Sequence, residues 1–188
     1  MWLGDGVYAA RRAANGTWGA PQRIAPRGRY PVGGGQVAID AAGNALVAIR
    51  AFDLETYNWR VMTIAQRASK EAWERPFWLS PKGPTEGPPG PSAGEPSLAM
   101  NARGDAVVVW PQAVAGSPRA LARMRPAGRL AWRPLEAVSV RERGVPAVSA
   151  SIDAEGAATA AWAARPRAGA RTATVVRVAT RPALRPAA

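Results

Sequence analysis

The chain has 188 residues, with 25 lysines and arginines against 13 acidic residues and a formal net charge of +12. It contains no cysteine and no histidine, which excludes disulfide frameworks, thiolate metal sites and the commonest general base of enzymes. The length is sufficient for one domain with a core, and no apolar run approaches the ~20 residues of a membrane span. We therefore expect no cofactor, no bound metal and no membrane span.

From the N-terminus onward, two short sequence patterns recur. The first joins two apolar segments through the turn Asp/Asn-x-x-Gly, and it occurs as VAIDAAGNALVAIR from Val37, LAMNARGDAVVVW from Leu98 and ASIDAEGAATAAW from Ala150. The second pattern opens the chain as VYAARRAANGTWGAPQRIAP from Val7 and returns as TIAQRASKEAWERPFWLS from Thr63 and ALARMRPAGRLAWRPLEAVS from Ala120. The period is roughly 55 residues, which is typical of solenoids and propellers.

Each full repeat predicts four strands. The Asp/Asn-x-x-Gly turn separates the first two strands, because an Asp or Asn side chain can hydrogen-bond the backbone two residues on. The second strand is apolar at successive positions, as in ALVAI, AVVVW and ATAAW, which indicates a strand covered on both faces. The last two strands carry more arginine and alternate, as in LARMR from Leu121, and we expect them to be the wetter, outer strands.

The predicted fold is all-β, a partial β-propeller of repeated four-stranded antiparallel blades in a single repeat domain, 1–188. Incomplete blades cover 1–30 and 147–183, and full blades cover 36–80 and 96–140. A β-sandwich is the alternative, and the Ala-rich final segment could be helical on propensity alone. Because 188 residues do not close a ring, we expect a piece of a longer propeller that, alone, either self-associates through open blade edges or is poorly soluble.

The patterns D-x-x-G-N/D-A-x-V-x-W and R-x-x-x-G-x-W-x-x-P-x-x-L/V-S resemble the repeats of bacterial sialidase-like (BNR or Asp-box-like) β-propeller proteins. The resemblance covers nearly the whole chain. The Asp box S/T-x-D-x-G-x-T-W is itself absent, since Asn15 to Trp18 keep the glycine and the tryptophan without the aspartate. The resemblance implies a propeller scaffold and an extracytoplasmic location in a bacterial protein, and such a scaffold hosts many functions.

Most tryptophans recur with the repeat, and we expect them to pack between blades. These are Trp2, Trp18, Trp73, Trp110, Trp132 and Trp162. Trp59 and Trp78 have no counterpart. Trp59 lies in a stretch of blade two, RAFDLETYNWR, that is longer and more charged than its equivalents PQAVAGSP and AARPRAGAR, and Trp78 follows in the same blade. Blade two is therefore the specialised one.

Because successive antiparallel strands reverse direction, the variable connections all lie at one end of the blades, opposite the short repeated turns. Loops positioned by a rigid scaffold are where binding usually occurs. Aromatic faces pack on sugar rings, and arginine forks bind carboxylates. The predicted ligand-binding residues are Arg50, Phe52, Asp53, Tyr57, Trp59 and Arg60.

The positive charge favours carbohydrate or another anionic polymer, although a GC-rich coding sequence would also explain it. Nucleic-acid motifs are absent, so we expect no specific nucleic-acid partner. A sialidase-like site needs clustered arginines, a tyrosine nucleophile and acids; Arg50, Asp53, Glu55 and Tyr57 have the right types, but the equivalent later loops supply no acid or tyrosine. We predict a non-catalytic binding module, not an enzyme. A structural or protein–protein propeller, or part of a sialidase-like glycoside hydrolase, is the alternative.

Overall fold

The computed structural model describes residues 2–3, 6–13, 15–25, 32–82, 91–165 and 174–183. These residues form strands and turns and contain no helix, so the predicted all-β class is confirmed. The helical alternative for the Ala-rich final segment is wrong, because its described residues lie in strands. Within the same ranges no helix exists that could cross a membrane.

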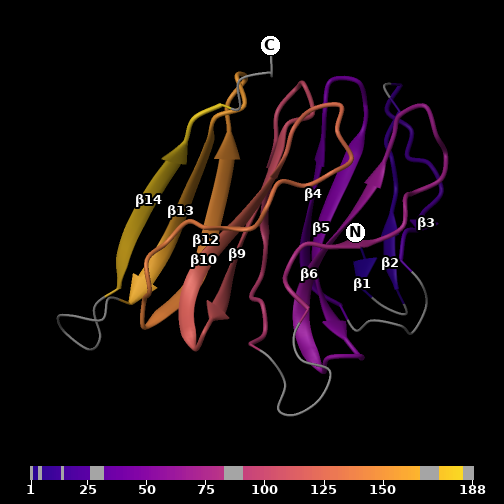
Figure 1. The fold of residues 1–188 in the computed structure, drawn as a ribbon. Helices are drawn as coiled ribbons and strands as arrows, with labels where there is room; N and C mark the ends of the chain where they lie inside the picture. Colours follow the sequence, from indigo (N-terminus) through magenta and orange to yellow (C-terminus); the bar gives the residue numbers. More distant parts are fainter. Residues whose placement is uncertain are drawn as a thin grey trace.

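The strands form four antiparallel sheets that follow one another along the chain (Figure 1). The first sheet contains β1 (Trp2–Leu3), β2 (Val7–Ala9) and β3 (Gln22–Arg23). The second contains β4 (Val32–Ile39), β5 (Ala45–Asp53), β6 (Asn58–Gln66) and β7 (Phe77–Trp78). The third contains β8 (Ser97–Met100), β9 (Ala106–Val114), β10 (Ser117–Arg125) and β11 (Glu136–Ala137). The fourth contains β12 (Gly144–Ile152), β13 (Ala158–Arg165) and β14 (Val175–Arg181).

The predicted Asp/Asn-x-x-Gly turns connect the first two strands of a repeat. Between β4 and β5, Asn44 N donates a hydrogen bond of 2.8 Å to Asp40 Oδ1, and Gly43 N donates to the Asp40 carbonyl. Gly43 has a φ of 82°, and Gly104, at the same place in the next repeat, has 95°. Side-chain-bearing residues rarely adopt this left-handed conformation, so the turn requires the glycine that the pattern repeats.

The core lies between successive sheets, in three apolar clusters. The first joins Val7, Ile24 and Ala25 to Val47, Ile49, Ala51, Met62 and Ile64. The second joins Ala48, Val61 and Leu79 to Ala93, Val108, Trp110 and Leu121. The third joins Val107, Val109, Ala120, Ala122 and Met124 to Val145, Ala158, Ala160, Trp162 and Ala164. Each cluster therefore takes side chains from two neighbouring sheets, which stack face to face.

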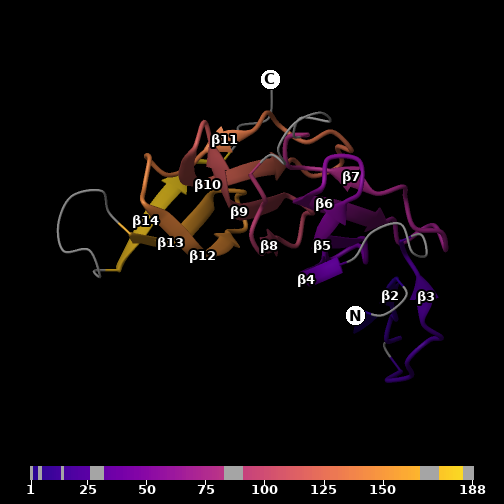
Figure 2. The ribbon, with the colours of Figure 1, turned by 90° about the horizontal axis from the view of Figure 1, so that it is seen from below.

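The first strands of the second, third and fourth sheets lie side by side on one flank of an arc (Figure 2). Leu98 N donates a hydrogen bond of 2.6 Å to Gln36 Oε1, which links β8 to β4. Ala150 N donates one of 3.0 Å to Ser97 Oγ, which links β12 to β8. Four sheets in series do not fit the sandwich alternative. The described sheets do not close into a ring, so the complete propeller stays a prediction.

Two burial predictions are wrong. β13 was expected to be covered on both faces, yet its residues alternate between buried and half-buried. One face packs on the third sheet, and no sheet in the described ranges packs on the other. β6, expected to be an outer and wetter strand, is almost wholly buried, because the first and third sheets pack on its two faces.

The recurring tryptophans also differ among themselves. Trp110 and Trp162 are buried between sheets, as predicted, and Trp73 and Trp132 are half-buried. Trp18 is 65% exposed, so the prediction that it packs between blades is wrong. The sequence repeat fixes the place of each tryptophan on its own sheet, whereas the neighbouring sheet determines whether the ring is covered.

Candidate functional site

Two segments meet at the end of the sheets where β4 and β8 begin. One is the connection between β5 and β6, and the other is the stretch 91–96 directly before β8. Ala93 N donates a hydrogen bond of 2.7 Å to the Trp59 carbonyl, and Trp59 N donates one of 3.2 Å to Ser92 Oγ. The stretch 91–96 is thus fixed against the hairpin that carries most of the predicted ligand-binding residues.

Arg50 is held from three directions at this junction. Its Nε donates a hydrogen bond of 2.9 Å to the Ala93 carbonyl, and its Nη1 lies 3.3 Å from Glu95 Oε1. Its guanidinium carbon lies 4.3 Å from the centroid of the Trp59 ring, which is a cation–π distance. The side chain retains 27% exposure while these contacts fix its orientation.

Three aromatic residues extend this surface. The rings of Phe52 and Trp59, which are opposite each other on β5 and β6, have centroids 5.5 Å apart at an angle of 72°. The Tyr57 ring lies 6.4 Å from that of Phe52 at 86°. Both pairs have the edge-to-face geometry that aromatic rings prefer. Tyr57 is exposed and has a φ of 50°, and Ala115, in the hairpin between β9 and β10, has 48°, so this conformation belongs to the hairpin turn.

Glu95 was not predicted from the sequence, and its carboxylate rests against the backbone of β4. A Cβ atom at Gly33 would lie 3.1 Å from Glu95 Oε1, and one at Gly34 would collide with Glu95 Oε2. Glycine inside a strand often marks a place where another group approaches closely. The glycines at the start of β4 therefore make the space that the exposed Glu95 carboxylate occupies.

Asp53 and Arg60 belong to the opposite face of the same sheet. Asp53 Oδ2 and Arg60 Nη1 are 2.6 Å apart, and both side chains are buried. Arg60 also donates to the Ser80 carbonyl at 2.9 Å and lies 4.4 Å from the centroid of the Trp78 ring. Burial raises the pKa of Asp53, but hydrogen bonds from Arg60, from the backbone of Glu55 and from Thr56 outweigh it, so the pKa lies below its ordinary value of 3.8.

The structure thus divides the six predicted residues. It brings Arg50, Phe52, Tyr57 and Trp59 together at the junction. We call these four residues, together with Glu95, the arginine–aromatic surface. It places Asp53 and Arg60 in a buried ion pair that supports the hairpin from behind. The surface offers flat apolar faces, a fixed guanidinium and one exposed carboxylate. In the described part of the chain, no cluster of side chains is suited to hold a metal ion.

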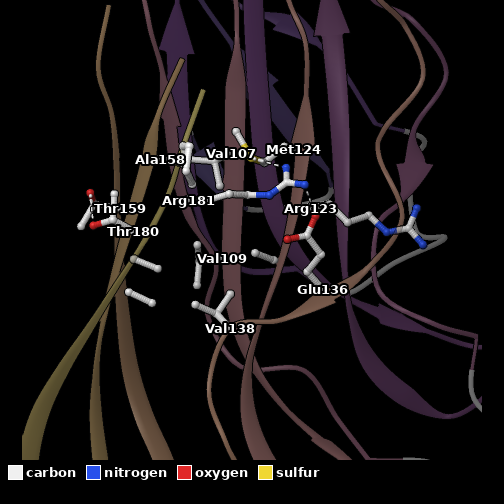
Figure 3. Close-up of a pocket in the computed structure, with 14 residues that line it drawn as sticks. Val107, Val109, Arg123, Met124, Glu136, Val138, Ala158, Thr159, Thr180 and Arg181 are labelled. Atoms are coloured by element: carbon white, nitrogen blue, oxygen red, sulfur yellow. Dashed lines mark hydrogen bonds and ion pairs between the residues drawn. The ribbon is translucent and has the colours of Figure 1, made fainter. Parts of the chain in front are cut away.

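A hollow of about 260 Å³ lies elsewhere, between the third and fourth sheets (Figure 3). Its walls are mostly small apolar side chains such as Val107, Ala158 and Ala160. Arg181 and Glu136, 2.9 Å apart, form an ion pair beside it. The charges of this pair neutralise each other, Arg123 is the other charged residue of the lining, and no aromatic ring lines the hollow, so it lacks the chemistry of the arginine–aromatic surface.

By fold, the chain is an all-β protein of consecutive antiparallel sheets. It is similar to the crystal structure of an endo-arabinase from Bacteroides thetaiotaomicron VPI-5482, with a TM-score of 0.50 and 16% sequence identity. The similarity covers 95% of this chain and 66% of that one, so the chain spans just under two thirds of that structure's length. At this identity the likeness concerns the fold. Neither a protein-family model nor a curated protein sequence matches the chain.

This comparison corrects two predictions. The structure with a similar fold is that of an endo-arabinase, a glycoside hydrolase, so the predictions of a non-catalytic binding module and of a chain that is not an enzyme are contradicted. The predicted relation to carbohydrate-active proteins agrees with the comparison. The narrower resemblance to sialidase-like (BNR) proteins is not supported by it.

Proposed function

We propose that the chain is part of a glycoside hydrolase, and that the arginine–aromatic surface binds a polysaccharide with Glu95 as one of the catalytic carboxylates. The observation that carries the proposal is the exposed Glu95 carboxylate, fixed beside Arg50 and the Trp59 ring. The likeness in fold to an endo-arabinase supports it. Arabinan is accordingly the first substrate to test.

Glycoside hydrolysis normally uses two carboxyl groups, one on each side of the bond that is cleaved. Glu95 Oε1 accepts a hydrogen bond of 3.3 Å from Arg50, and the carboxylate lies against the glycines at the start of β4. Glu95 is itself 3.3 Å from Arg50 but is half exposed, whereas Asp53 and Glu142 are buried in ion pairs with Arg60 and Arg177. Glu55, exposed beside Lys82, takes no part in the contacts that join Glu95, Arg50 and Trp59. We therefore assign the second catalytic carboxylate to a part of the protein outside the described residues.

The activity test compares Glu95→Gln with the unchanged protein. Reducing-end release from arabinan and a panel of other polysaccharides is measured, and the substitution is expected to lower the rate on the order of 100-fold or more, because it removes a proton-transferring or nucleophilic group. Glu55→Gln is the matched control, since Glu55 lies at the same end in an exposed ion pair with Lys82. Absence of hydrolysis on every polymer, or equal rates for both variants, would refute the proposal.

A second prediction concerns substrate binding. Tyr57→Ala combined with Trp59→Ala is expected to raise KM several-fold, because an aromatic contact contributes about 0.5–1.5 kcal/mol beyond its buried area. Initial rates over a range of substrate concentrations separate KM from kcat. Tyr57→Ala alone should change the free energy of unfolding by no more than ~0.5 kcal/mol, since its ring is exposed. An unchanged KM in the double variant would remove the rings from the binding site.

The position of the sheets supports two finer proposals. We propose that they are successive blades of a larger propeller, because β4, β8 and β12 are joined through side chains in the same way. β14 exposes Val175, Val176 and Val178, and this apolar strand supports self-association. An enzyme acting on external polysaccharides would work outside the cytoplasm, in keeping with the extracytoplasmic location expected from the sequence.

A further inference from the structure

A cleft of about 680 Å³ lies at the opposite end of the molecule, between the first and second sheets. One wall is the segment that follows β2, with Arg11, Arg12 and Trp18, and the other comes from β4 and from the connection after β6, with Lys70. Short repeated turns occupy this end in the other sheets. The sequence therefore gave no reason to expect a binding site here.

Trp18 is one of the residues that line this cleft, and it is 65% exposed. Its backbone is fixed, because Trp18 pairs with Arg12 in a β-bridge. Trp132 has the same place in the third sheet, yet there the ring is half-buried in an apolar cluster and faces Arg125 at 5.6 Å from the ring centroid. Trp73 and Trp132 each pack on the cluster shared with the preceding sheet, and no described sheet precedes the first, so the Trp18 ring stays exposed and available to a ligand.

The cations of the cleft are free of acidic partners in the described ranges. Arg11 Nη2 donates to Gln66 Oε1 at 3.1 Å, and Arg12 Nε donates to the Gly16 carbonyl at 3.1 Å. These neutral acceptors orient the guanidiniums without cancelling their charge. With Lys70, three cations line the cleft against one acid, Glu71. The cleft therefore favours an anionic ligand.

The floor of the cleft is apolar. Val37 and Ile39 on β4 are both more than half exposed there, although β-branched side chains on a strand are usually covered. An indole face and an apolar floor between cations fit a ligand whose rings have apolar faces and whose edges carry carboxylates. A nucleic acid has one phosphate per nucleotide and requires a longer track of cations than this cleft provides.

We propose that this cleft binds an acidic polysaccharide of uronate residues, with Trp18 as the stacking platform and Arg11, Arg12 and Lys70 as the carboxylate contacts. Planar guanidinium groups bind carboxylates in a bidentate manner, whereas an ammonium acts as a point charge. The site is distinct from the arginine–aromatic surface and does not depend on the proposed hydrolysis. It would hold the protein on an acidic polymer independently of cleavage at the other end.

Binding of the full chain to polygalacturonate is measured by isothermal titration calorimetry, with neutral arabinan and single-stranded DNA as comparison polymers. Trp18→Ala with Arg12→Gln is expected to weaken polygalacturonate binding about tenfold or more, a difference of ~1.4 kcal/mol. Raising the salt concentration from 50 mM to about 500 mM should also weaken it, because the exposed charges are screened. Leu130→Ala with Arg129→Gln, which changes an exposed apolar residue and an exposed arginine in the connection between β10 and β11 of the third sheet, outside the cleft, is the matched control and should bind as the unchanged protein does.

Two variants distinguish a failure of the proposed cleft binding from a failure of the proposed hydrolysis. Glu95→Gln is expected to lose hydrolysis and to keep polygalacturonate binding, whereas the Trp18 and Arg12 variant is expected to show the reverse. Thermal melting confirms that the cleft variant is folded, since both of its changed side chains are exposed. Failure of the unchanged chain to bind polygalacturonate, equal binding by the cleft variant, or tighter binding of DNA or arabinan would overturn the inference.

Discussion

Trp110→Ala is expected to lower the free energy of unfolding by about 3–5 kcal/mol, the range for truncation of a large buried aromatic residue. The Trp110 side chain is fully buried between the second and third sheets, among Val61, Leu79 and Leu121. Alanine would leave a cavity at this interface, because the strands on both sides are held in their ladders and can collapse little. Urea unfolding at fixed pH measures the loss from the midpoint and the slope.

A hydrogen bond of the indole nitrogen is a second reason to expect Trp110→Ala to lower the stability. Trp110 Nε1 donates a hydrogen bond of 3.0 Å to Gln112 Oε1, and Gln112 Nε2 donates one of 2.9 Å to the Pro91 carbonyl. Pro91 begins the stretch that continues to Ala93 and Glu95. Trp110→Phe should therefore keep most of the apolar contact and recover much of the stability. If Trp110→Ala cost no more than exposed Trp18→Ala, the two sheets would not pack as described.

The sequence patterns predicted the strands and turns because they are local. A glycine at the fourth position of Asp/Asn-x-x-Gly specifies a backbone conformation within a few residues, and Gly43, Gly104 and Gly156 all adopt it. Burial on both faces depends on a neighbouring sheet, which the repeat does not encode. The ALVAI and AVVVW segments are covered on both sides, whereas ATAAW, with the same pattern, is covered on one.

The candidate site was predictable where its residues are close in sequence. The hairpin around Tyr57 supplies Arg50, Phe52 and Trp59, whose types and loop position indicated a ligand surface. Alternation along a strand separates Asp53 from Arg50 and Phe52, since side chains an odd number of positions apart point to opposite faces. Applied at this hairpin, that rule would have placed the buried ion pair correctly.

Glu95 was missed because it reaches the site through tertiary structure. It lies 45 residues from Arg50 in the chain, and the space for its carboxylate is left by glycines of another sheet. The one local signal was the run of glycines in β4, which weakens a strand unless another group occupies the space.

Asp53→Ala is expected to destabilise the protein by about 3–5 kcal/mol, as is usual when one partner of a buried ion pair is removed. Arg60 would keep its charge in a buried position, beside the Trp78 ring and with a remaining hydrogen bond to the Ser80 carbonyl. Thr56 Oγ1 would also lose Asp53 Oδ2 as its acceptor, at 2.9 Å. The loss should loosen the hairpin that carries the arginine–aromatic surface.

The double variant Asp53→Ala with Arg60→Met separates charge from packing. It removes both charges and keeps an apolar chain against Trp78, so it should be more stable than Asp53→Ala alone, and the double-mutant cycle gives the coupling between the two residues. Glu55→Ala is the control, because the exposed Glu55–Lys82 pair should contribute no more than about 1 kcal/mol. A loss from Asp53→Ala as small as this control would mean that the pair is not buried.

Lowering the pH should reduce the free energy of unfolding for the same reason as the Asp53 substitution, because protonation removes the carboxylate charge. The pKa of Asp53 in the folded protein lies below its ordinary value of 3.8, so the unfolded chain binds this proton more readily than the folded one. The ion pair therefore contributes its full stability above about pH 4, and that contribution is lost as the pH falls through the lower, folded-state pKa. Urea unfolding between pH 7 and pH 2.5 should show a steeper fall for the unchanged protein than for the Asp53→Ala, Arg60→Met variant, because only the former loses a carboxylate whose charged form the fold stabilises. Parallel curves for the two proteins would show that the Asp53 carboxylate gains nothing from folding.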